Sequence, residues 1–216
     1  MHGETQPAAL HTLADLHGGD HACFLFRTPA EHRAVLTAYM SQGLRQGEKV
    51  VTIVDETPPD VIVDYLRDAA GVDAAACLAS GQLTILTCAE TYLAGGTFSP
   101  QAMLARLSDE TRRALAQGYP VLRITGEMTW LLHSSTAAQQ LVEHEADLNQ
   151  LVPTSACIAL CQYDLGRFSP ATLLDVLHTH PPGRARRAGL RQLLLHSARR
   201  TAAGQPGHGH AACTLG

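Results

Sequence analysis

The chain has 216 residues, a net charge of -4 with its histidines neutral, and 45% hydrophobic residues. These values fit one globular domain with an extension, because a chain of this length buries a substantial core whereas two separate domains would be cramped. They exclude a membrane-spanning protein, since no apolar run approaches the roughly 20 residues that a spanning helix needs. The first residues, "MHGETQPAAL", lack the basic and apolar regions of a secretory signal. We therefore expect a cytoplasmic protein.

The predicted elements alternate between strands and helices along the first 180 residues. Apolar runs predict strands at 22–26, 50–55, 82–87, 120–130 and 156–164. Helical patterns lie between them, from about Pro29 to the turn "QGLRQGEK", then at 61–70, 100–117, 134–151 and 170–178, with a short helical turn at 75–81. Continuous apolar strands are typical of parallel sheets that are buried on both faces. The pattern therefore predicts an open α/β fold, with helices on both faces of a mostly parallel sheet of about five or more strands.

The charges divide the chain into two parts. Residues 1–175 hold all 20 acidic residues and ten of the 16 basic ones, whereas 176–216 hold six arginines and no acid. We expect a flexible N-terminus over 1–9, one domain over 10–181, and a basic, largely disordered tail over 182–216 with a possible short helix near 185–200. Lys49 is the single lysine and does not follow a glycine-rich loop, so the phosphate-binding motif GxxxxGK[ST] is absent.

Polar and aromatic side chains follow the predicted strands. In a doubly wound sheet, ligands bind beyond the carboxyl ends of the strands, where loops and helix N-termini meet. Candidate ligand-binding residues at these ends are Glu56, Tyr92, Glu127, Trp130 and Asp164. So many carboxylates oppose a polyphosphate ligand unless metal ions intervene. Trp130 is more typical of packing in the core, and the alternative is that its ring lines a pocket beside Glu127.

Arg123 interrupts an otherwise apolar strand and is a further candidate. A buried guanidinium needs a carboxylate partner, and Glu127 and Asp55 are the expected ones. A core ion pair without any ligand explains the residue as well as a binding role does.

His21 and Cys23 lie two residues apart on the first predicted strand, so their side chains point to the same face. They are candidates for a metal-ligand pair or for a soft apolar pocket with one hydrogen-bonding nitrogen. The alternative is a buried cysteine that acts as a small hydrophobe beside a strand-entry histidine. A metal site would need further ligands that the neighbouring sequence does not show, and His21 opens its strand, at the end opposite the expected crevice.

Other cysteines and histidines have simpler interpretations. Six cysteines occur, at 23, 77, 88, 157, 161 and 213, without a CxxC pair, so neither a zinc ribbon nor a thioredoxin-type motif is indicated. Cys157 and Cys161 share a strand face with Ala159, which is typical of core packing. The histidines at 178, 180, 208 and 210 fit a flexible C-terminal segment that binds metal adventitiously.

An ordered set of motifs resembles the MEDS domain, a sensory domain named after methanogens, methylotrophs and the regulator DcmR. The motifs are "GDHACFLF" (19–26), "QGLRQGEKVVTIVDE" (42–56), "SGQLTILT" (80–87), "LRITGEMTW" (122–130), "EADLNQL" (145–151) and "CIALCQYDLGRFSPATLLDVLHTHP" (157–181). The resemblance covers about 10–181. It implies a RecA/KaiC-like fold with an eroded phosphate loop, sensing of small hydrocarbon derivatives, and output through kinase, anti-sigma-factor or helix-turn-helix modules. His21 and Cys23 match the family's GDHxC pattern, which favours them as ligand-binding residues.

These observations lead to a non-catalytic sensory domain that binds a small ligand and signals through a regulatory partner: a kinase, an anti-sigma factor or a transcription regulator. No cofactor is expected, although a metal at His21 and Cys23 is compatible with the sequence, as is a homo-oligomer. One alternative is a residual nucleotide-binding or ATPase-like protein in which Glu127 and Asp164 hold magnesium and Glu56 acts as a base. Another is an interaction scaffold whose arginine-rich tail contacts an acidic partner or nucleic acid without sequence preference. Neither a membrane nor a sequence-specific nucleic acid is an expected partner.

Overall fold

Six parallel strands form one sheet in the order β3-β2-β4-β5-β1-β6. The computed structural model describes residues 13–67, 69, 71–133, 137–180 and 190–194. The strands are β1 (His21–Phe26), β2 (Lys49–Val54), β3 (Leu83–Thr87), β4 (Leu122–Glu127), β5 (Cys157–Asp164) and β6 (Leu190–Leu194). Their parallel arrangement confirms the predicted α/β sheet.

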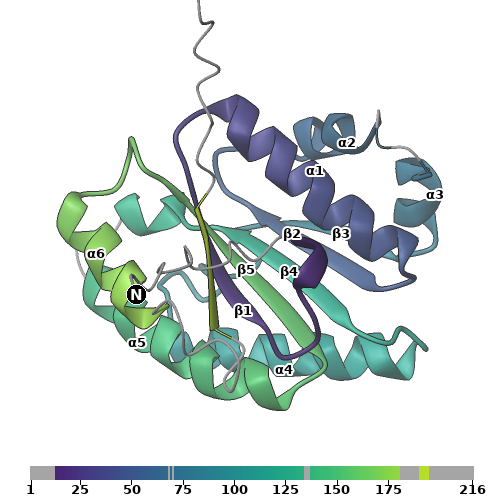
Figure 1. Cartoon of the computed structure of the whole chain (residues 1–216). Helices are drawn as coiled ribbons and strands as arrows, with labels where there is room; N and C mark the ends of the chain where they lie inside the picture. Colours follow the sequence, from purple (N-terminus) through teal and green to yellow (C-terminus); the bar gives the residue numbers. More distant parts are fainter. Residues whose placement is uncertain (1–12, 68, 70, 134–136, 181–189, 195–216) are drawn as a thin grey trace, which may run out of the picture.

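Helices cover both faces of the sheet (Figure 1). One layer contains α1 (Pro29–Arg45), α2 (Pro59–Arg67) and α3 (Ala74–Ala79), and the other contains α4 (Pro100–Ala116), α5 (Ala137–Leu151) and α6 (Pro170–Thr179). Three short 3-10 helices, η1 (Leu13–Asp15), η2 (Thr129–His133) and η3 (Val152–Thr154), complete the described elements. The sheet and its two helical layers make the three-layer arrangement that alternating strands and helices predict.

Three of the long helices begin with the same local device. Thr28, Ser99 and Ser169 are N-caps whose side-chain oxygens accept a backbone N–H from the first turn, and a proline follows each of them. The cap satisfies a donor that has no partner within the helix, and the fixed φ of proline suits the first helical position. The sequence therefore sets where α1, α4 and α6 begin.

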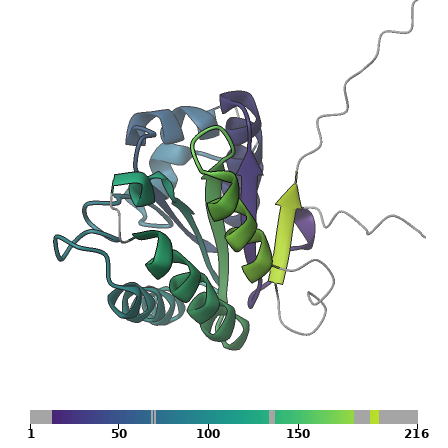
Figure 2. The same cartoon turned by 90° about the vertical axis from the view of Figure 1, so that its left-hand side faces the viewer.

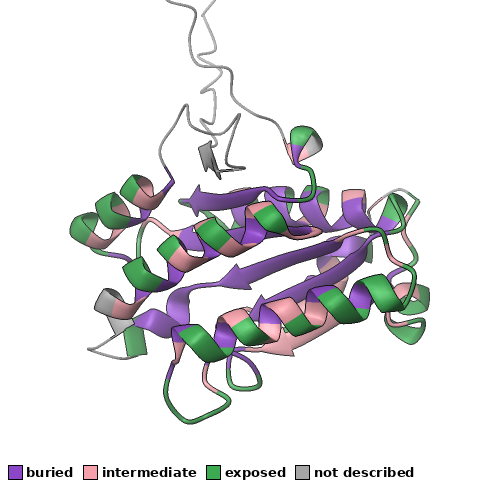
Figure 3. Cartoon of the chain, turned by 90° about the horizontal axis from the view of Figure 1, so that it is seen from below, coloured by how far each residue is buried: buried purple, intermediate pink, exposed green. Residues whose placement is uncertain are grey.

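Two hydrophobic cores lie on opposite faces of the sheet because successive strand residues point in opposite directions. Within β1, Ala22, Phe24 and Phe26 pack toward the α1 layer, whereas Cys23 and Leu25 pack toward the α4–α6 layer. Figure 3 shows the buried strands between helices whose outer surfaces are exposed. His21 has the same orientation as Cys23, so it enters the core beneath α5 and α6.

Two expectations need adjustment. The predicted fourth strand is shorter, since β4 ends at Glu127 and η2 follows. Part of the region where a short helix was expected instead forms β6, which pairs with β1 at one edge of the sheet (Figure 2). The rest of 182–216 and the segment 1–9 lie outside the described residues. In the described part of the chain, no helix has the length and apolar character needed to cross a membrane.

Candidate functional site

The turn between β1 and α1 occupies the place where a phosphate loop would lie. The Glu31 carboxylate accepts a hydrogen bond from the backbone N–H of Arg27 at 2.8 Å, and the Thr28 hydroxyl oxygen accepts one from the backbone N–H of Glu31 at 3.2 Å. Pro29 has no N–H to offer. A carboxylate therefore already occupies a backbone donor that a nucleotide phosphate would need, and these residues do not fit a phosphate cradle.

The carboxylates at the strand ends stabilise loops. Glu127 Oε2 accepts hydrogen bonds from the backbone N–H groups of Asp55 at 2.9 Å and Thr57 at 3.1 Å. Asp55 Oδ2 accepts one from the Thr129 hydroxyl at 2.8 Å. Glu127 Oε2 is therefore occupied by hydrogen bonds to the loop that follows β2. This does not favour the magnesium-binding role that Glu127 has in the ATPase-like alternative.

Glu56 and Asp164 have local roles as well. Glu56 forms an exposed ion pair with Arg167, with Oε2 and Nη1 2.5 Å apart, and this hydrogen bond lowers the pKa of Glu56. Asp164 Oδ1 accepts a hydrogen bond from the backbone N–H of Gly166 at 2.8 Å. Both side chains thus hold the loop between β5 and α6 in place.

Arg123 does not pair with Glu127 or Asp55, contrary to expectation. It is the second residue of β4, opposite Val50, so it lies near the end of the sheet away from Glu127. Its Nε donates to Glu48 Oε2 at 2.5 Å, and its guanidinium lies 4.8 Å above the Tyr39 ring. A side chain at Gly43 would collide with it, because an added Cβ would lie 2.6 Å from Arg123 Cδ. Arg123 therefore forms a core ion pair that joins β4 to the turn between α1 and β2, and it contacts α1 through the Tyr39 ring.

Tyr92 and Trp130 lie together on the other face of the sheet. Their rings stack with centroids 4.8 Å apart and an angle of 19°, and Phe98 and His144 pack around them. The Tyr92 hydroxyl reaches the backbone of β4 at Gly126, where any Cβ would overlap it. These aromatic residues form one wall of the core between the sheet and α5.

A small cavity lies between β4, β5 and helices α4 and α5. Its volume is about 20 Å³. Its walls include Tyr92, Met103, Leu107, His144, Leu148 and Cys161. The lining is mostly apolar, and it offers a few groups with hydrogen-bonding capacity, which is the composition expected of a site for a small organic molecule.

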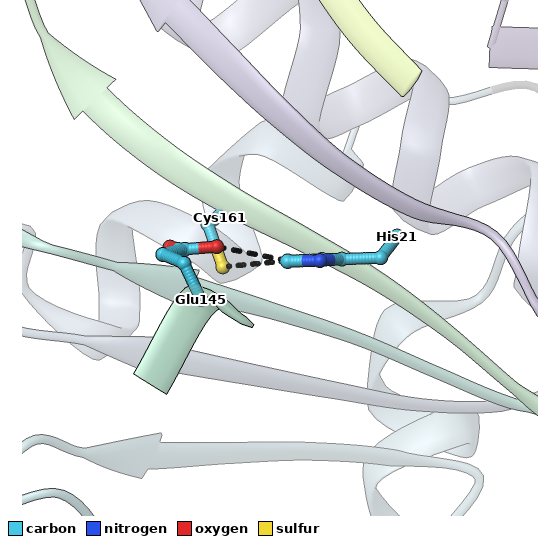
Figure 4. Close-up of side chains that lie close together, drawn as sticks. All are labelled: His21, Glu145 and Cys161. Carbon is cyan, nitrogen blue, oxygen red and sulfur yellow. Dashed lines mark hydrogen bonds and ion pairs between the residues drawn. The ribbon is translucent and has the colours of Figure 1, made fainter. Parts of the chain in front are cut away.

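Next to this cavity, four ligand-type side chains converge in the core. The Nε2 atom of His21 lies 3.2 Å from Glu145 Oε2, 3.5 Å from Cys161 Sγ and 3.4 Å from His180 Nε2. His180 Nε2 is also 3.4 Å from Glu145 Oε2. The first three side chains, from β1, α5 and β5, point toward one another in Figure 4. We call His21, Glu145, Cys161 and His180 the buried cluster.

Neighbouring polar groups hold the buried cluster in place. Asn149 Oδ1 lies 2.7 Å from His21 Nδ1, and Asn149 Nδ2 donates to the Thr179 carbonyl oxygen at 2.8 Å. His180 Nδ1 lies 2.9 Å from the Val176 carbonyl oxygen. The Tyr163 hydroxyl donates to Glu145 Oε1. Each of the two imidazole rings is thus fixed on its outer side, with Nε2 turned toward the centre.

Burial and charge shift the pKa values of this region. Burial alone would raise the pKa of Glu145, but His180 and His21 outweigh it and hold that pKa well below its usual range. Burial, followed by the charge of Glu145, raises the pKa of the Cys161 thiol well above normal. Burial also lowers the pKa of His144, which lines the cavity, to about 4. The site therefore combines an ionised carboxylate with a neutral thiol and a neutral cavity histidine at neutral pH.

The structure brings together only part of the predicted site. His21, Tyr92 and Trp130 lie on the α4–α6 face, as does Cys23, the register partner of Cys161. The thiol that His21 Nε2 contacts is that of Cys161, which was expected to be core packing. His180 was expected in a flexible segment, yet its side chain is fully buried. Glu56, Glu127, Arg123 and Asp164 lie elsewhere.

Glu145 was the main omission of the sequence-based prediction. A signal for it exists in α5, where Leu141, Glu145 and Leu148 are spaced i, i+4 and i+7 and are all buried. Residues at this spacing share one face of a helix. An acid in the middle of an apolar helical stripe indicates a carboxylate with a buried partner, although the pattern alone does not identify His21 or His180 as that partner.

Two comparisons place the chain among known proteins. It is 27% identical over 164 residues to the transcriptional repressor DcmR of Methylorubrum extorquens, an alignment that covers 74% of this chain and 58% of that protein. A KaiC-like protein from the archaeon Pyrococcus horikoshii OT3 has a similar structure, with a TM-score of 0.52 at 13% sequence identity, over 75% of this chain and 69% of that one. The structural likeness confirms the RecA/KaiC-like fold.

The family comparison covers most of the domain. The sequence profile of MEDS, described as the methanogen/methylotroph, DcmR sensory domain, matches residues 20–181. This range contains all four residues of the buried cluster and the whole lining of the cavity. The chain therefore belongs to the MEDS family of sensory domains.

Proposed function

We propose that this domain senses a small organic molecule, which binds in the cavity between β4, β5, α4 and α5, and that it signals through a regulatory partner protein. The observation that carries this proposal is the position of the cavity. Cys161 belongs both to the cavity wall and to the buried cluster, and the cavity residue His144 directly precedes Glu145. A molecule in the cavity would therefore contact Cys161, and through the buried cluster this contact is linked to β1, β5, α5 and the end of α6.

The size of the cavity favours a ligand of a few non-hydrogen atoms. Its volume of about 20 Å³ exceeds the roughly 10–15 Å³ that a single water molecule needs on the same measure. Its mostly apolar wall favours a short hydrocarbon derivative, and the neutral His144 ring and the Cys161 thiol offer it one polar contact. These properties agree with the small hydrocarbon derivatives that the family resemblance implies.

Sensing requires that the ligand bind one conformation of the domain better than another. A difference of about 1–3 kcal/mol in binding free energy is enough to change the affinity for a partner substantially. The helix α5 is the element best placed to respond, because it contributes His144 and Leu148 to the cavity and Glu145 to the buried cluster. A small displacement of α5 would alter the exposed surface of the α4–α6 layer.

The relative supports a role in transcriptional regulation. That protein is named as a transcriptional repressor, and this chain spans 58% of its length. We therefore propose a transcription regulator, a kinase or an anti-sigma factor as the partner that receives the signal. The absence of a phosphate cradle at the β1–α1 turn favours this non-catalytic role over nucleotide hydrolysis.

Ligand screening with a cavity-filling variant tests the proposal. Short alcohols, short aldehydes and chlorinated methanes would each be added to the full chain, with the thermal unfolding midpoint as the readout. A ligand at 100 times its dissociation constant stabilises the native state by about 2.7 kcal/mol. We expect at least one class to raise the midpoint, and Ala159→Val, which fills the cavity wall, to abolish the rise.

Ala105→Val is the matched control, because it makes the same chemical change at an exposed position of α4. It should respond to the ligand as the unmodified chain does. A panel that never raises the midpoint would contradict the proposal, and so would a rise that is equally large in Ala159→Val.

A further inference from the structure

We propose that His21, Glu145, Cys161 and His180 bind one divalent transition-metal ion of the zinc class at the centre of the buried cluster. The donors come from β1, α5, β5 and the residue that follows α6, so the site exists only in the folded domain. It lies beside the cavity and shares Cys161 with it, and metal binding can be tested without any small-molecule ligand.

Four of the six distances between the donor atoms are close to those around a tetrahedral ion. With metal–nitrogen and metal–oxygen bonds of about 2.0–2.2 Å and a metal–sulfur bond of about 2.3 Å, neighbouring donors lie about 3.3–3.7 Å apart. The corresponding distances here are 3.2 Å (His21 to Glu145), 3.5 Å (His21 to Cys161), 3.4 Å (His21 to His180) and 3.4 Å (His180 to Glu145). The donor atoms of His21, Glu145 and Cys161 all lie within 4.8 Å of one another.

The hydrogen bonds on the outer side of each histidine orient it for metal binding. Asn149 donates its amide N–H to the Thr179 carbonyl oxygen, which turns its Oδ1 toward His21. His21 Nδ1 must then carry a proton to donate, and His180 Nδ1 must do the same toward the Val176 carbonyl oxygen. In the neutral form with Nδ1 protonated, each ring directs the lone pair of Nε2 toward the centre, as in metal sites whose ligand histidines are fixed by a carbonyl or amide oxygen.

One carboxylate oxygen lacks the partner that a metal ion would supply. Tyr163 donates to Glu145 Oε1, whereas Glu145 Oε2 is buried and has no hydrogen-bond partner. Two Nε2 lone pairs also face this oxygen. The Cys161 thiol, 3.5 Å from His21 Nε2, has a single proton to donate among these three acceptors, and a cation at the centre would supply the attraction that the remaining lone pairs lack.

The net charge of the site would then be zero. One divalent cation balances the carboxylate of Glu145 and the thiolate that Cys161 becomes when it binds metal, while both histidines remain neutral. A neutral centre avoids the large desolvation cost of an unbalanced charge in the core. Binding would thus release the proton of the Cys161 thiol.

The types of donor select the class of metal. Two imidazoles, one thiolate and one carboxylate suit Zn²⁺ and similar transition-metal ions, which accept nitrogen and sulfur in tetrahedral geometry. Mg²⁺ and Ca²⁺ bind oxygen ligands in larger numbers, and the buried cluster provides a single carboxylate. Four protein donors complete a tetrahedron, so the ion would connect β1, β5, α5 and the end of α6 as a closed structural centre.

The metal content of the full chain, purified without an affinity tag, tests the proposal. We expect about one zinc ion per chain to remain after desalting, as measured by elemental mass spectrometry. After removal of the metal, Co²⁺ should restore one equivalent and give both the visible absorption of tetrahedral cobalt and a thiolate-to-cobalt charge-transfer band. This spectrum identifies the metal ligands in the unmodified chain. The test therefore remains valid even if a variant fails to fold.

Matched variants locate the ion. Cys161→Ser should remove the charge-transfer band, whereas Cys23→Ser, at the register partner on β1, should keep it. His180→Gln should lose the ion, whereas His178→Gln, at an exposed position two residues earlier, should retain it. Asn149→Ala should weaken zinc binding by about 10–100-fold, because it removes the hydrogen bond that orients His21.

Three results would overturn the proposal. The first is a folded, unmodified chain that binds neither Zn²⁺ nor Co²⁺. The second is a cobalt complex without the thiolate band. The third is metal that persists in both Cys161→Ser and His180→Gln but disappears when His208 and His210 are replaced, which would mean an adventitious ion only.

Discussion

The carboxyl edge of the sheet and the face beneath α5 and α6 use their polar side chains in opposite ways. At the carboxyl edge, Glu31 and Glu127 accept hydrogen bonds from backbone N–H groups of the adjoining loops. Beneath α5 and α6, the side chains of the buried cluster point at one another, and Glu145 Oε2 has no hydrogen-bond partner. The hydrogen bonds of the first region are made within the protein, whereas the second region presents the donor atoms of the metal site that we propose.

This difference shows how a nucleotide fold can acquire another role. The fold places its usual site at the carboxyl ends of the strands. In this chain the loops there are stabilised by the protein's own carboxylates, while the cavity and the buried cluster lie within the α4–α6 layer. The fold is retained, and the binding region that we propose lies on one face of the sheet instead of at its edge.

The largest predicted effect concerns the carboxylate of the buried cluster. Glu145→Ala leaves the buried Tyr163 hydroxyl without its acceptor and removes the carboxylate that would balance the charge of the proposed ion. It should lower the free energy of unfolding by about 3–5 kcal/mol, the typical cost of leaving a buried charge without its partner. Urea denaturation measures the loss. Glu143→Ala, at an exposed position of α5, is the control and should change stability by less than about 0.5 kcal/mol. Equal effects of the two variants would show that the buried cluster contributes nothing to stability.

An intermediate effect is expected at the carboxyl edge. Glu127→Ala leaves the backbone N–H groups of Asp55 and Thr57 without their acceptor and should cost about 1–3 kcal/mol in the same denaturation experiment. Magnesium should not change the stability of the unmodified chain, because Glu127 serves the loop. Marked stabilisation by magnesium that disappears in Glu127→Ala would favour the nucleotide-site interpretation instead.

Acid should destabilise the domain in part through His32, in the α1 layer. Burial lowers the pKa of His32 below its ordinary value of 6.5, and the hydrogen bond to Gln162 only partly offsets this. The unfolded chain therefore binds the proton more readily, and the free energy of unfolding must fall as the pH decreases below about 6.5. His32→Gln should show a shallower fall when denaturation is followed from pH 7 to pH 5. A slope identical to that of the unmodified chain would contradict this assignment.

The smallest structural effect should come from the exposed ion pair between Glu56 and Arg167. Solvent screens exposed pairs and leaves most of them with little net contribution. Glu56→Gln should therefore leave the denaturation midpoint close to that of the unmodified chain. A loss as large as that of Glu127→Ala would mean that the loop between β5 and α6 depends on this pair.

No effect at all is expected from nucleotide. ATP with magnesium at millimolar concentration should leave the thermal midpoint unchanged, because the β1–α1 turn presents a carboxylate where a phosphate would bind. Saturable binding by calorimetry would contradict this expectation and would restore the ATPase-like alternative.

The fold could be predicted well from the sequence because its signals are local. The runs around Phe24, Ile53 and Ile158 predict buried strands, and Thr28 and Ser169 with the prolines after them mark the starts of α1 and α6. The end of the fourth strand was less clear, since "EMTW" continues the apolar pattern into η2.

The site could be predicted only in part because its contacts are not local. His21 was identified from its strand position, but its partners lie 124 residues away at Glu145 and 159 residues away at His180. Cys23 was paired with His21 because the two are close in sequence. The thiol that contacts His21 is instead that of Cys161, the register partner of Cys23 on the neighbouring strand β5. Such partners emerge only when α5 and α6 are packed over β1 and β5.

The most direct test of the central claim is a methyl NMR titration of the full chain with the small molecules of the ligand panel. Methyl groups that line the cavity, in Met103, Leu107 and Leu148, should shift together and saturably, while that of Val54 at the carboxyl end of β2 should not move. Saturable shifts confined to Val54 and its neighbours, with the cavity methyl groups unchanged, would place the ligand at the carboxyl edge and contradict the account.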